Sequence, residues 1–441
     1  MKLYFVGFEQ ANVGDILPVL EALRAHPRLE PVFVPGTDFK PHRGLLTARP
    51  PAGIDAQRLE SALDSVQVAD AERRARRLCG EARRWTASEP AARSVHQRLL
   101  AAQLDRYVRR PEMASLFRAY TVIERAADAW ARRERPRVVV LSEDSDYLRG
   151  RLLARVFAAH GVHIVCLTPW YYSTFRSYPL VGARQAHAYL VGTPAHARRL
   201  LASGVARRCV HVVGHPGFDA LAAQASPTPP PGHFLYALQG LPWEREIASD
   251  LQAAVGEHAG ARLTIKPHPQ LPLPTWLVGL SRRTGLRTAP ARQPAIELVR
   301  DTHCVVAQTS RLLFEASLLG RRVIVPHYDA TPLRLEVPDR DAPAAVAHSP
   351  AELGERVRAV LRGRGRALSG AAIAPYHPHA TQRAVQVLEE LALTAGSSRA
   401  APTSRTVRRP RVQSESPPGS AGNGRTERPS RKATAAHPRT D

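Results

Sequence analysis

The sequence predicts an α/β protein made of two doubly wound units, and three observations lead to this prediction. The chain of 441 residues is two to three times as long as a typical domain. Short runs of consecutive apolar residues, typical of strands buried on both faces, alternate with segments of helical apolar spacing. This alternation occurs twice, once on each side of a proline-rich stretch. Strands that alternate with helices form parallel sheets covered by crossover helices.

The first unit spans residues 1–219 and is expected to bind an acceptor. Its apolar runs predict strands at residues 2–6, 29–34, 137–141, 163–167, 188–191 and 209–213. Residues 55–135 interrupt this alternation: they are rich in Ala, Arg, Leu and Glu, with apolar side chains at helical intervals. They predict a helical insertion.

The second unit spans residues 233–395 and follows a linker at 220–232 that contains four prolines. Its expected strands are residues 234–238, 262–265, 304–307 and 323–325, and a helix at about 379–393 is expected to close it. The sequence thus predicts two Rossmann-like domains that face each other across the linker. Residues 396–441 hold little besides Ser, Pro, Arg, Thr and Gly, which predicts a disordered basic tail.

The charge and the cysteines narrow the class of protein. The 62 Lys and Arg against 39 Asp and Glu give a net charge of +23, which favours an anionic partner. Only four of the basic residues are lysines, and we attribute this arginine bias to GC-rich coding, not to selection for nucleic acid. The four cysteines lie far apart, without a C-x-x-C pair, so neither a zinc knuckle nor a disulfide framework is indicated.

The cellular location follows from the apolar runs. No run reaches the roughly 20 apolar residues of a membrane span, and the first apolar run is too short for a secretory signal. We therefore expect a cytoplasmic protein. Its basic body and tail would make peripheral contact with the inner face of an anionic membrane.

The residues after each strand are the candidate site, because ligands of open parallel sheets bind at the carboxyl ends of the strands. After the strand at 304–307, Thr309 and Ser310 stand where a helix cap belongs, so the helix start is expected to hold a phosphate. Glu315 would then accept hydrogen bonds from a ribose. Alternatively, the two hydroxyl residues only cap the helix and Glu315 pairs with Arg311, four residues earlier.

The segment IKPHP supplies a cation and an imidazole at the end of another strand. Lys266 is the only lysine between Lys40 and Lys432, and with His268 it would neutralise a departing diphosphate. Alternatively, this segment is a rigid turn with a surface histidine. Gln239 and Gly240 follow the strand at 234–238 and are expected to bind the same donor.

Two further loops belong to the first unit. Gly214 allows close approach of the backbone to a ligand, and His215 would contact phosphate or sugar. Alternatively, this loop is a structural turn in which Asp219 caps a helix. After the first strand, Glu9 is the candidate general base, whereas Asp15 is expected to cap the first helix.

Weaker signals come from three segments. Residues 143–146 (EDSD) follow a strand and would bind substrate or start a helix, and residues 170–172 (WYY) would stack on a ligand or pack between domains. His377 and His379 lack carboxylate or cysteine partners, so no metal site is predicted. The sequence contains no P-loop, G-x-G-x-x-G, G-x-S-x-G or H-E-x-x-H motif.

Three segments, taken in order, resemble the GT-B superfamily. They are AYLVGTPAHARRLLASGVARRCVHVVGHPGFDAL, IKPHP and VVAQTSRLLFEASLLGRRVIVP. The likeness points to the branch that contains UDP-N-acetylglucosamine 2-epimerases, CDP-glycerol glycerophosphotransferases, Kdo transferases and capsule polysaccharide enzymes. It spans roughly residues 1–390.

The resemblance implies roles for the candidate residues. Thr309, Ser310 and Glu315 would hold the donor nucleotide, and Lys266 and His268 would lie near the transferred bond. Glu9 is similar to the first-loop glutamate that acts as base in Kdo transferases. The epimerases carry a histidine and a glutamate with a glycine where this chain has LTPWY at residues 167–171, which disfavours epimerisation.

We therefore expect a metal-independent glycosyltransferase that needs no cofactor. It would move a glycosyl or glycerophosphate-like group from a nucleotide-sugar or CDP-alcohol donor to a cell-envelope or capsule polysaccharide, or to a lipid-linked acceptor. One alternative is a UDP-sugar 2-epimerase. The other is a non-catalytic arginine-rich protein that binds nucleic acid or membranes, although no specific nucleic acid is expected.

Overall fold

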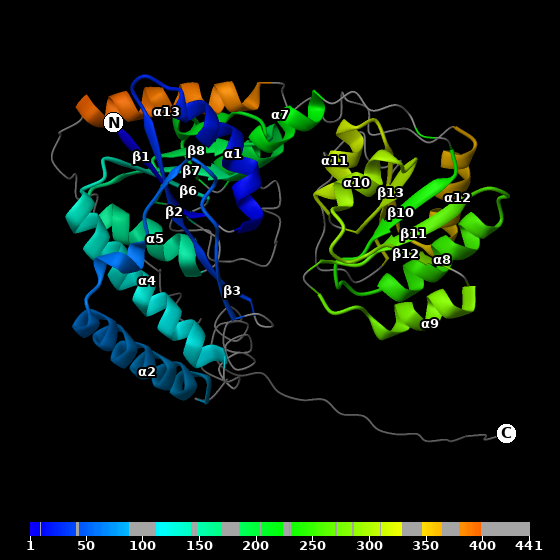
Figure 1. Cartoon of the computed structure of the whole chain (residues 1–441), viewed down its shortest axis with the longest axis horizontal. Helices are drawn as coiled ribbons and strands as arrows, with labels where there is room; N and C mark the ends of the chain where they lie inside the picture. Colours follow the sequence, from blue (N-terminus) through cyan, green and yellow to red (C-terminus); the bar gives the residue numbers. More distant parts are fainter. Residues whose placement is uncertain are drawn as a thin grey trace, which may run out of the picture. The chain divides into compact units, whose positions relative to one another are not determined.

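The computed structural model describes most of the chain up to residue 397 (Figure 1). The described residues are 1–8, 10–40, 44–87, 112–142, 144, 148–168, 185–202, 204–223, 229, 231–269, 271–284, 286–308, 310–328, 346–363 and 379–397. The expected tail therefore lies outside them.

The first sheet is parallel throughout and has the order β5-β2-β1-β6-β7-β8-β9. Its strands are β1 (Lys2–Phe8), β2 (Glu30–Pro35), β5 (Asp55–Ala56), β6 (Val138–Leu141), β7 (His163–Thr168), β8 (Ala188–Val191) and β9 (Val210–Val212). The apolar runs thus predicted the long strands of this sheet correctly. They missed the short edge strand β5 and the antiparallel hairpin of β3 (Thr37–Lys40) and β4 (Gly44–Thr47).

Helices cover both faces of the first sheet and bury two apolar clusters. They are α1 (Gln10–Arg24), α5 (Leu148–Ala159) and α6 (Pro194–Ala202), with a short 3-10 turn, η3 (Arg207–Cys209). Helix α7 (Pro216–Ala222) packs against α1, and its Phe218 belongs to an apolar cluster of the second sheet. The helical insertion is confirmed as η1 (Leu59–Ala62), α2 (Ser65–Ala87) and α4 (Glu112–Glu134). In α4 the fully buried Trp130 packs edge-on against Tyr4 of β1, with ring centroids 4.9 Å apart. The insertion is therefore part of the core.

Helix α13 (Ala380–Ser397) packs on the first sheet, although the sequence placed it in the second unit. Its residues Ala384, Leu388 and Ala392 join the same apolar cluster as α1, and Figure 1 shows α13 beside α1 and α7. The carboxylate of Asp219 in α7 accepts hydrogen bonds from the N–H groups of Ala380 (3.1 Å) and Thr381 (2.8 Å). Asp219 thus caps a helix, but a distant one.

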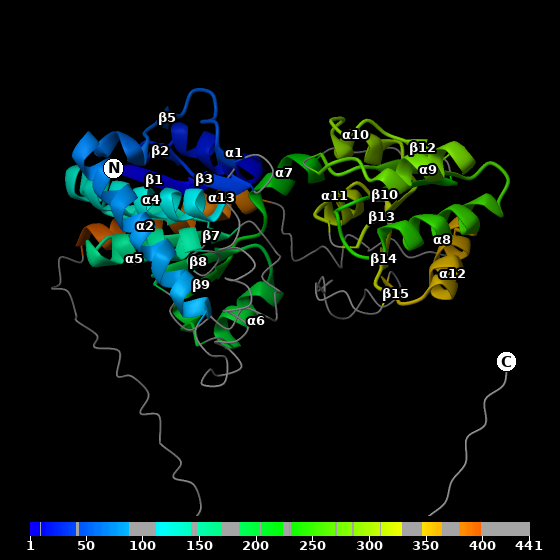
Figure 2. The same cartoon turned by 90° about the horizontal axis from the view of Figure 1, so that it is seen from below.

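The second sheet is also parallel and has the order β12-β11-β10-β13-β14-β15. Its strands are β10 (His233–Ala237), β11 (Arg262–Lys266), β12 (Arg287–Thr288), β13 (Cys304–Val306), β14 (Arg322–Pro326) and β15 (Val346–Ala347). Its helices are α8 (Glu244–Gly256), α9 (Thr275–Thr284), α10 (Ala295–Arg300), α11 (Leu312–Leu318) and α12 (Pro350–Leu361). Helices α8 and α12 pack side by side (Figure 2).

Each sheet has one point at which the strand order reverses. In the first sheet it lies between β1 and β6, and in the second between β10 and β13. Ligands of open α/β sheets bind at the carboxyl ends of the strands that flank such a point. In the described ranges, no helix is long and apolar enough to cross a membrane.

Candidate functional site

The loops after β10 and β13 flank the reversal in the second sheet, and a hydrogen bond joins them. Gln308 follows β13 and donates from Nε2 to the carbonyl oxygen of Pro242, 2.9 Å away. Its side chain is buried, and Oε1 has no hydrogen-bond partner in the described part of the chain. A side-chain hydrogen bond therefore joins the two loops at the carboxyl ends of β10 and β13, and we call this end of the sheet its connected edge.

The loop after β10 is held by a buried carboxylate. Glu244, the first residue of α8, accepts hydrogen bonds from the backbone N–H groups of Gln239 and Gly240, the latter at 2.8 Å. Burial raises the pKa of Glu244, although these amides favour its charged form. The two residues expected to bind a donor thus direct their amides at the protein's own carboxylate.

Lys266 ends β11, the neighbour of β10, and its ammonium group is largely occupied. Nζ donates to the carbonyl oxygens of Pro267 (2.9 Å) and Ala291 (2.7 Å), which uses two of its three hydrogens. Burial lowers the pKa of Lys266. His268, two residues further on, is partly exposed at the same edge. Both residues therefore lie next to the candidate site.

The start of α11 differs in detail from the expected cap. Thr309 lies outside the described residues, and Ser310 accepts a hydrogen bond at Oγ from the N–H of Leu312 (3.2 Å). Glu315 forms an ion pair with Arg311, with Oε1 2.7 Å from Nε. The pairing considered as the alternative for Glu315 is therefore present.

A second polar cluster surrounds Asp15, which lies inside α1 and is not its cap. The side chain is fully buried, and Oδ1 pairs with the guanidinium group of Arg311. The other carboxylate oxygen, Oδ2, has no hydrogen-bond partner among the described residues. Burial raises the pKa of Asp15 to about 6, although Arg311 opposes this shift. Asp15 is therefore a buried carboxylate that is only half satisfied.

His215 adjoins this cluster at the start of α7. Its Nε2 lies 3.9 Å from Oδ1 of Asp15, and its ring stacks on Phe218 with centroids 3.9 Å apart. Burial and the nearby Arg311 lower the pKa of His215 to about 3, so the imidazole is neutral at neutral pH. The guanidinium carbon of Arg311 lies 5.1 Å from the centre of the Phe218 ring.

Backbone geometry explains the glycines beside this cluster. Gly214 has a φ of +93°, which side chains other than glycine rarely adopt. A Cβ on Gly217 would lie 3.0 Å from both Cα and Oδ1 of Asp15. Gly217 therefore lets α7 approach α1 closely.

Sequence reasoning missed several residues that the structure brings together. Arg311 was considered only as a partner of Glu315, and Glu244 and Gln308 were not considered. The spacing of Arg311 and Glu315 gave a local signal for their pair. The pairing of Asp15 with Arg311 joins residues far apart in sequence, and no local pattern encodes it.

The remaining candidates do not enlarge the site. Asp144 is buried, and its Oδ2 accepts hydrogen bonds from the N–H groups of Gln185 (2.8 Å) and Ala186 (3.0 Å) and from the hydroxyl of Tyr189 (2.6 Å). It thereby holds the start of β8. Glu9, His377 and the expected stacking residues 170–172 lie outside the described residues. Within the described ranges, no three His, Cys, Asp or Glu residues are grouped to hold a metal.

Solved structures match this architecture over most of the chain. The UDP-GlcNAc 2-epimerase of Neisseria meningitidis has a TM-score of 0.56 and 14% identity, covering 88% of this chain and 100% of the other. For the Methanocaldococcus jannaschii UDP-GlcNAc 2-epimerase the TM-score is 0.51, with 11% identity over 88% and 100% of the two chains. The lipopolysaccharide outer core galactosyltransferase WaaB has a TM-score of 0.52 and 12% identity, covering 88% of this chain and 99% of the other. The chain has a GT-B fold.

The GT-B fold rests on structure and not on sequence. No protein-family model matches the sequence, and no curated protein matches it at a significant level. The two parallel sheets and the helical insertion agree with the fold class expected from the sequence.

Proposed function

We propose that this GT-B chain is a nucleotide-sugar enzyme that transfers a glycosyl or glycerophosphate-like group from its donor to an envelope or capsule acceptor. The observation that carries the proposal is the connected edge of the second sheet, where Gln308 joins the loops after β10 and β13 at the strand reversal. Its likeness to two UDP-GlcNAc 2-epimerases and a galactosyltransferase supports a nucleotide-sugar ligand.

The chemistry follows from the charges near this edge. Arg311 and Ser310 lie just before α11, and His268 follows β11, so a diphosphate here meets a guanidinium, a hydroxyl and an imidazole. Such fixed donors stabilise negative charge on a leaving phosphate. Glu9 follows β1 in sequence and would take the proton of the acceptor hydroxyl. The transfer is then a direct displacement at the donor.

Binding of the donor gives the first test. We expect at least one of UDP-, CDP-, CMP- or GDP-linked donors to raise the melting temperature of the wild-type protein, since ligands that bind only the folded state stabilise it. His268→Ala should remove most of this shift. His303→Ala is the matched control, because His303 precedes β13 and so lies at the amino ends of the strands, away from the candidate site. Equal shifts in both variants, or no shift with any donor, would contradict the proposal.

A UDP-sugar 2-epimerase is the second candidate, favoured by the likeness to two such enzymes. Inversion at C2 requires the C2–H bond to break and re-form. An epimerase would therefore introduce deuterium at C2 of UDP-GlcNAc in deuterium oxide without any acceptor, which proton NMR detects. A transferase releases nucleotide only when an acceptor is present, and it leaves C2 unlabelled.

A further inference from the structure

The guanidinium group of Arg311 is held by two carboxylates that come from helices on different sheets. Nη1 donates to Oδ1 of Asp15 in α1, and Nε lies 2.7 Å from Oε1 of Glu315 in α11. Helix α1 packs on the first sheet, whereas α11 packs on the second. The arginine therefore ties a helix of one sheet to a helix of the other.

The cluster around Arg311 carries a net negative charge, because two carboxylates share one guanidinium group. His215 lies 3.9 Å from Asp15 and adds no positive charge at neutral pH, since burial lowers its pKa to about 3. In the described part of the chain, Asp15 has no ion pair other than those with Arg311 and His215. As it stands, this cluster would repel a phosphate unless one carboxylate left the arginine.

Asp15 is the carboxylate whose contact with Arg311 can be exchanged. Glu315 follows Arg311 by four residues, so this pair stays together wherever the helix lies. Asp15 belongs to the other sheet's helices, and its Oδ2 has no hydrogen-bond partner among the described residues. The contact between α1 and Arg311 therefore uses only one of the two carboxylate oxygens.

Arg311 itself is accessible to a ligand. Its side chain is 26% exposed, and it follows Ser310 in the loop at the carboxyl end of β13, beside the connected edge. The proposed function places the donor phosphates in this loop. The planar fork of a guanidinium group fits carboxylate and phosphate oxygens in the same way, so the two anions compete for the same N–H groups.

We propose that Asp15 is an internal competitor of the donor phosphates: its carboxylate holds Arg311 in the free protein, and the diphosphate takes its place on the guanidinium group. This inference rests on the proposed function and adds a control to it. Binding of the donor releases Arg311 from Asp15 and so unties α1 from the start of α11. The exchange costs affinity, because the released carboxylate loses the cation that compensates its burial.

The test measures binding of inorganic pyrophosphate, and of the nucleoside diphosphate that stabilises the wild type, by calorimetric titration at pH 8. Asp15→Asn removes the competing charge and keeps the shape of the side chain. It should bind both ligands at least about 5-fold more tightly than the wild type, the lower end of typical couplings between sites. Asp128→Asn on α4 is the matched control. It makes the same change of net charge at a carboxylate that pairs with Arg132, and it should bind as the wild type does.

A second variant shows whether the gain in affinity passes through Arg311. Arg311→Met alone leaves Asp15 as a buried charge without its cation and is prone to unfold, so the double variant Asp15→Asn/Arg311→Met is used. It should lose the whole gain and bind no more tightly than the wild type. A gain that persists in the double variant would show that Asp15 acts by general repulsion and not by holding Arg311, which overturns the inference.

The remaining outcomes separate the inference from the proposed function. If neither the wild type nor Asp15→Asn binds a nucleoside diphosphate, the proposed function fails and the inference fails with it. If the wild type binds and Asp15→Asn binds equally well, only the inference fails. Weaker binding in Asp15→Asn would also overturn it, because Asp15 would then hold Arg311 in position for the ligand.

Discussion

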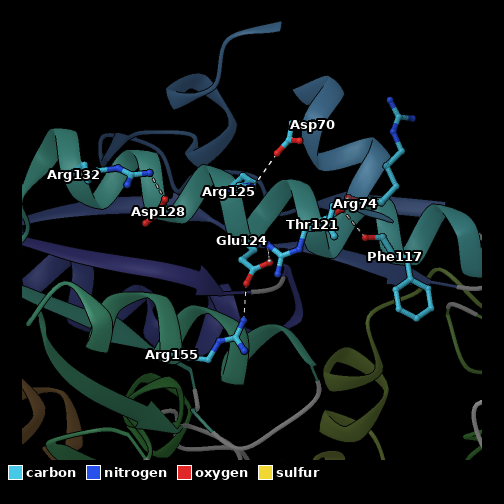
Figure 3. A network of polar contacts seen from close by, with 10 residues as sticks. Asp70, Arg74, Phe117, Thr121, Glu124, Arg125, Asp128, Arg132 and Arg155 are labelled. Atoms are coloured by element: carbon cyan, nitrogen blue, oxygen red, sulfur yellow. Dashed lines mark hydrogen bonds and ion pairs between the residues drawn. The ribbon is translucent and has the colours of Figure 1, made fainter. Parts of the chain in front are cut away.

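Two clusters in this protein use the same ion-pairing groups with different exposure to water. On α4, Glu124 pairs with Arg74 of α2 (3.1 Å) and Arg155 of α5 (2.6 Å), as Figure 3 shows. The side chain of Arg155 is 63% exposed. Around Asp15, the carboxylate that meets Arg311 is 0% exposed. The carboxylate of Glu124 is 16% exposed, and we call its cluster the surface network, whereas the carboxylate of Asp15 is fully buried.

Burial, more than the number of ion pairs, decides how much a charged side chain contributes to stability. Exposed pairs contribute about 0–1 kcal/mol each, because water solvates both partners well. A buried carboxylate has lost that solvation and depends on its partner, which is why the pKa of Asp15 rises to about 6. Asp144 is equally buried, but three donors satisfy it.

The largest expected effect follows from removing the partner of Asp15. Arg311→Met leaves a buried carboxylate without its cation and should lower the free energy of unfolding by about 3–5 kcal/mol at pH 8. Urea titration measures this change. Arg155→Met on α4 is the matched control and should cost about 0.5 kcal/mol. A similar cost for both variants would show that burial is not the deciding difference.

The second-largest expected effect is a change in how the free energy of unfolding depends on pH. The folded-state pKa of Asp15 is about 6 against an ordinary 3.8, so its contribution to stability falls as the pH rises through this window. The folded-state pKa of His215 is about 3 against an ordinary 6.5, so its contribution rises as the pH rises from 3 to 6.5. Between pH 4 and 6 the two contributions oppose each other.

Asp15→Asn removes the contribution of Asp15, which falls as the pH rises, and leaves the contribution of His215, which rises with pH. Relative to the wild type, the unfolding free energy of this variant should increase with pH between 4 and 6 by up to about 1.4 kcal/mol per pH unit. Unfolding curves at pH 4, 5, 6 and 8 measure this slope. Parallel pH profiles for the two proteins would refute the raised pKa of Asp15.

A smaller effect is expected at the centre of the surface network. Glu124→Gln keeps the shape of the side chain but removes the charge shared by Arg74 and Arg155. We expect a loss of about 0.5–1 kcal/mol at low salt that shrinks in 1 M NaCl, because salt screens exposed charges. Urea titration at the two salt concentrations tests it. The loss of stability in Arg311→Met should change much less with salt. Equal salt dependence of the two variants would contradict the difference in exposure between the two clusters.

The smallest effect is expected at the rim of the same network. Arg132 is 62% exposed and pairs with Asp128 one helical turn away. Arg132→Gln should cost no more than about 0.5 kcal/mol. Thermal unfolding detects a change of this size as a shift of about 1–2 °C. A cost above that of Glu124→Gln would contradict the ranking by exposure.

Local patterns were sufficient for most of the fold. Runs such as residues 234–238 and 304–307 predicted strands correctly, because a strand buried on both faces needs consecutive apolar side chains. The place of α13 was not predictable in this way. Its apolar stripe specifies a buried face but not which of the two sheets it covers, and only tertiary packing selects the first.

The candidate site was predictable in outline only. The rule that ligands bind after parallel strands led to Lys266, Gln239 and Ser310, which all lie at one edge of the second sheet. The rule does not show which polar groups are already used. Glu244 occupies two amides of one loop, and Lys266 donates to backbone carbonyls, and both facts depend on exact packing.

The path of the last helix has a practical consequence for dissecting this protein. The chain leaves the first sheet after α7, builds the second sheet and then returns to cover the first with α13, where Asp219 meets Ala380 and Thr381. A fragment cut at residue 223 would therefore lack one wall of its interior and expose the apolar surface that α13 covers. To obtain a stable half-molecule, residues 1–223 would have to be fused to 379–397 through a short designed connector.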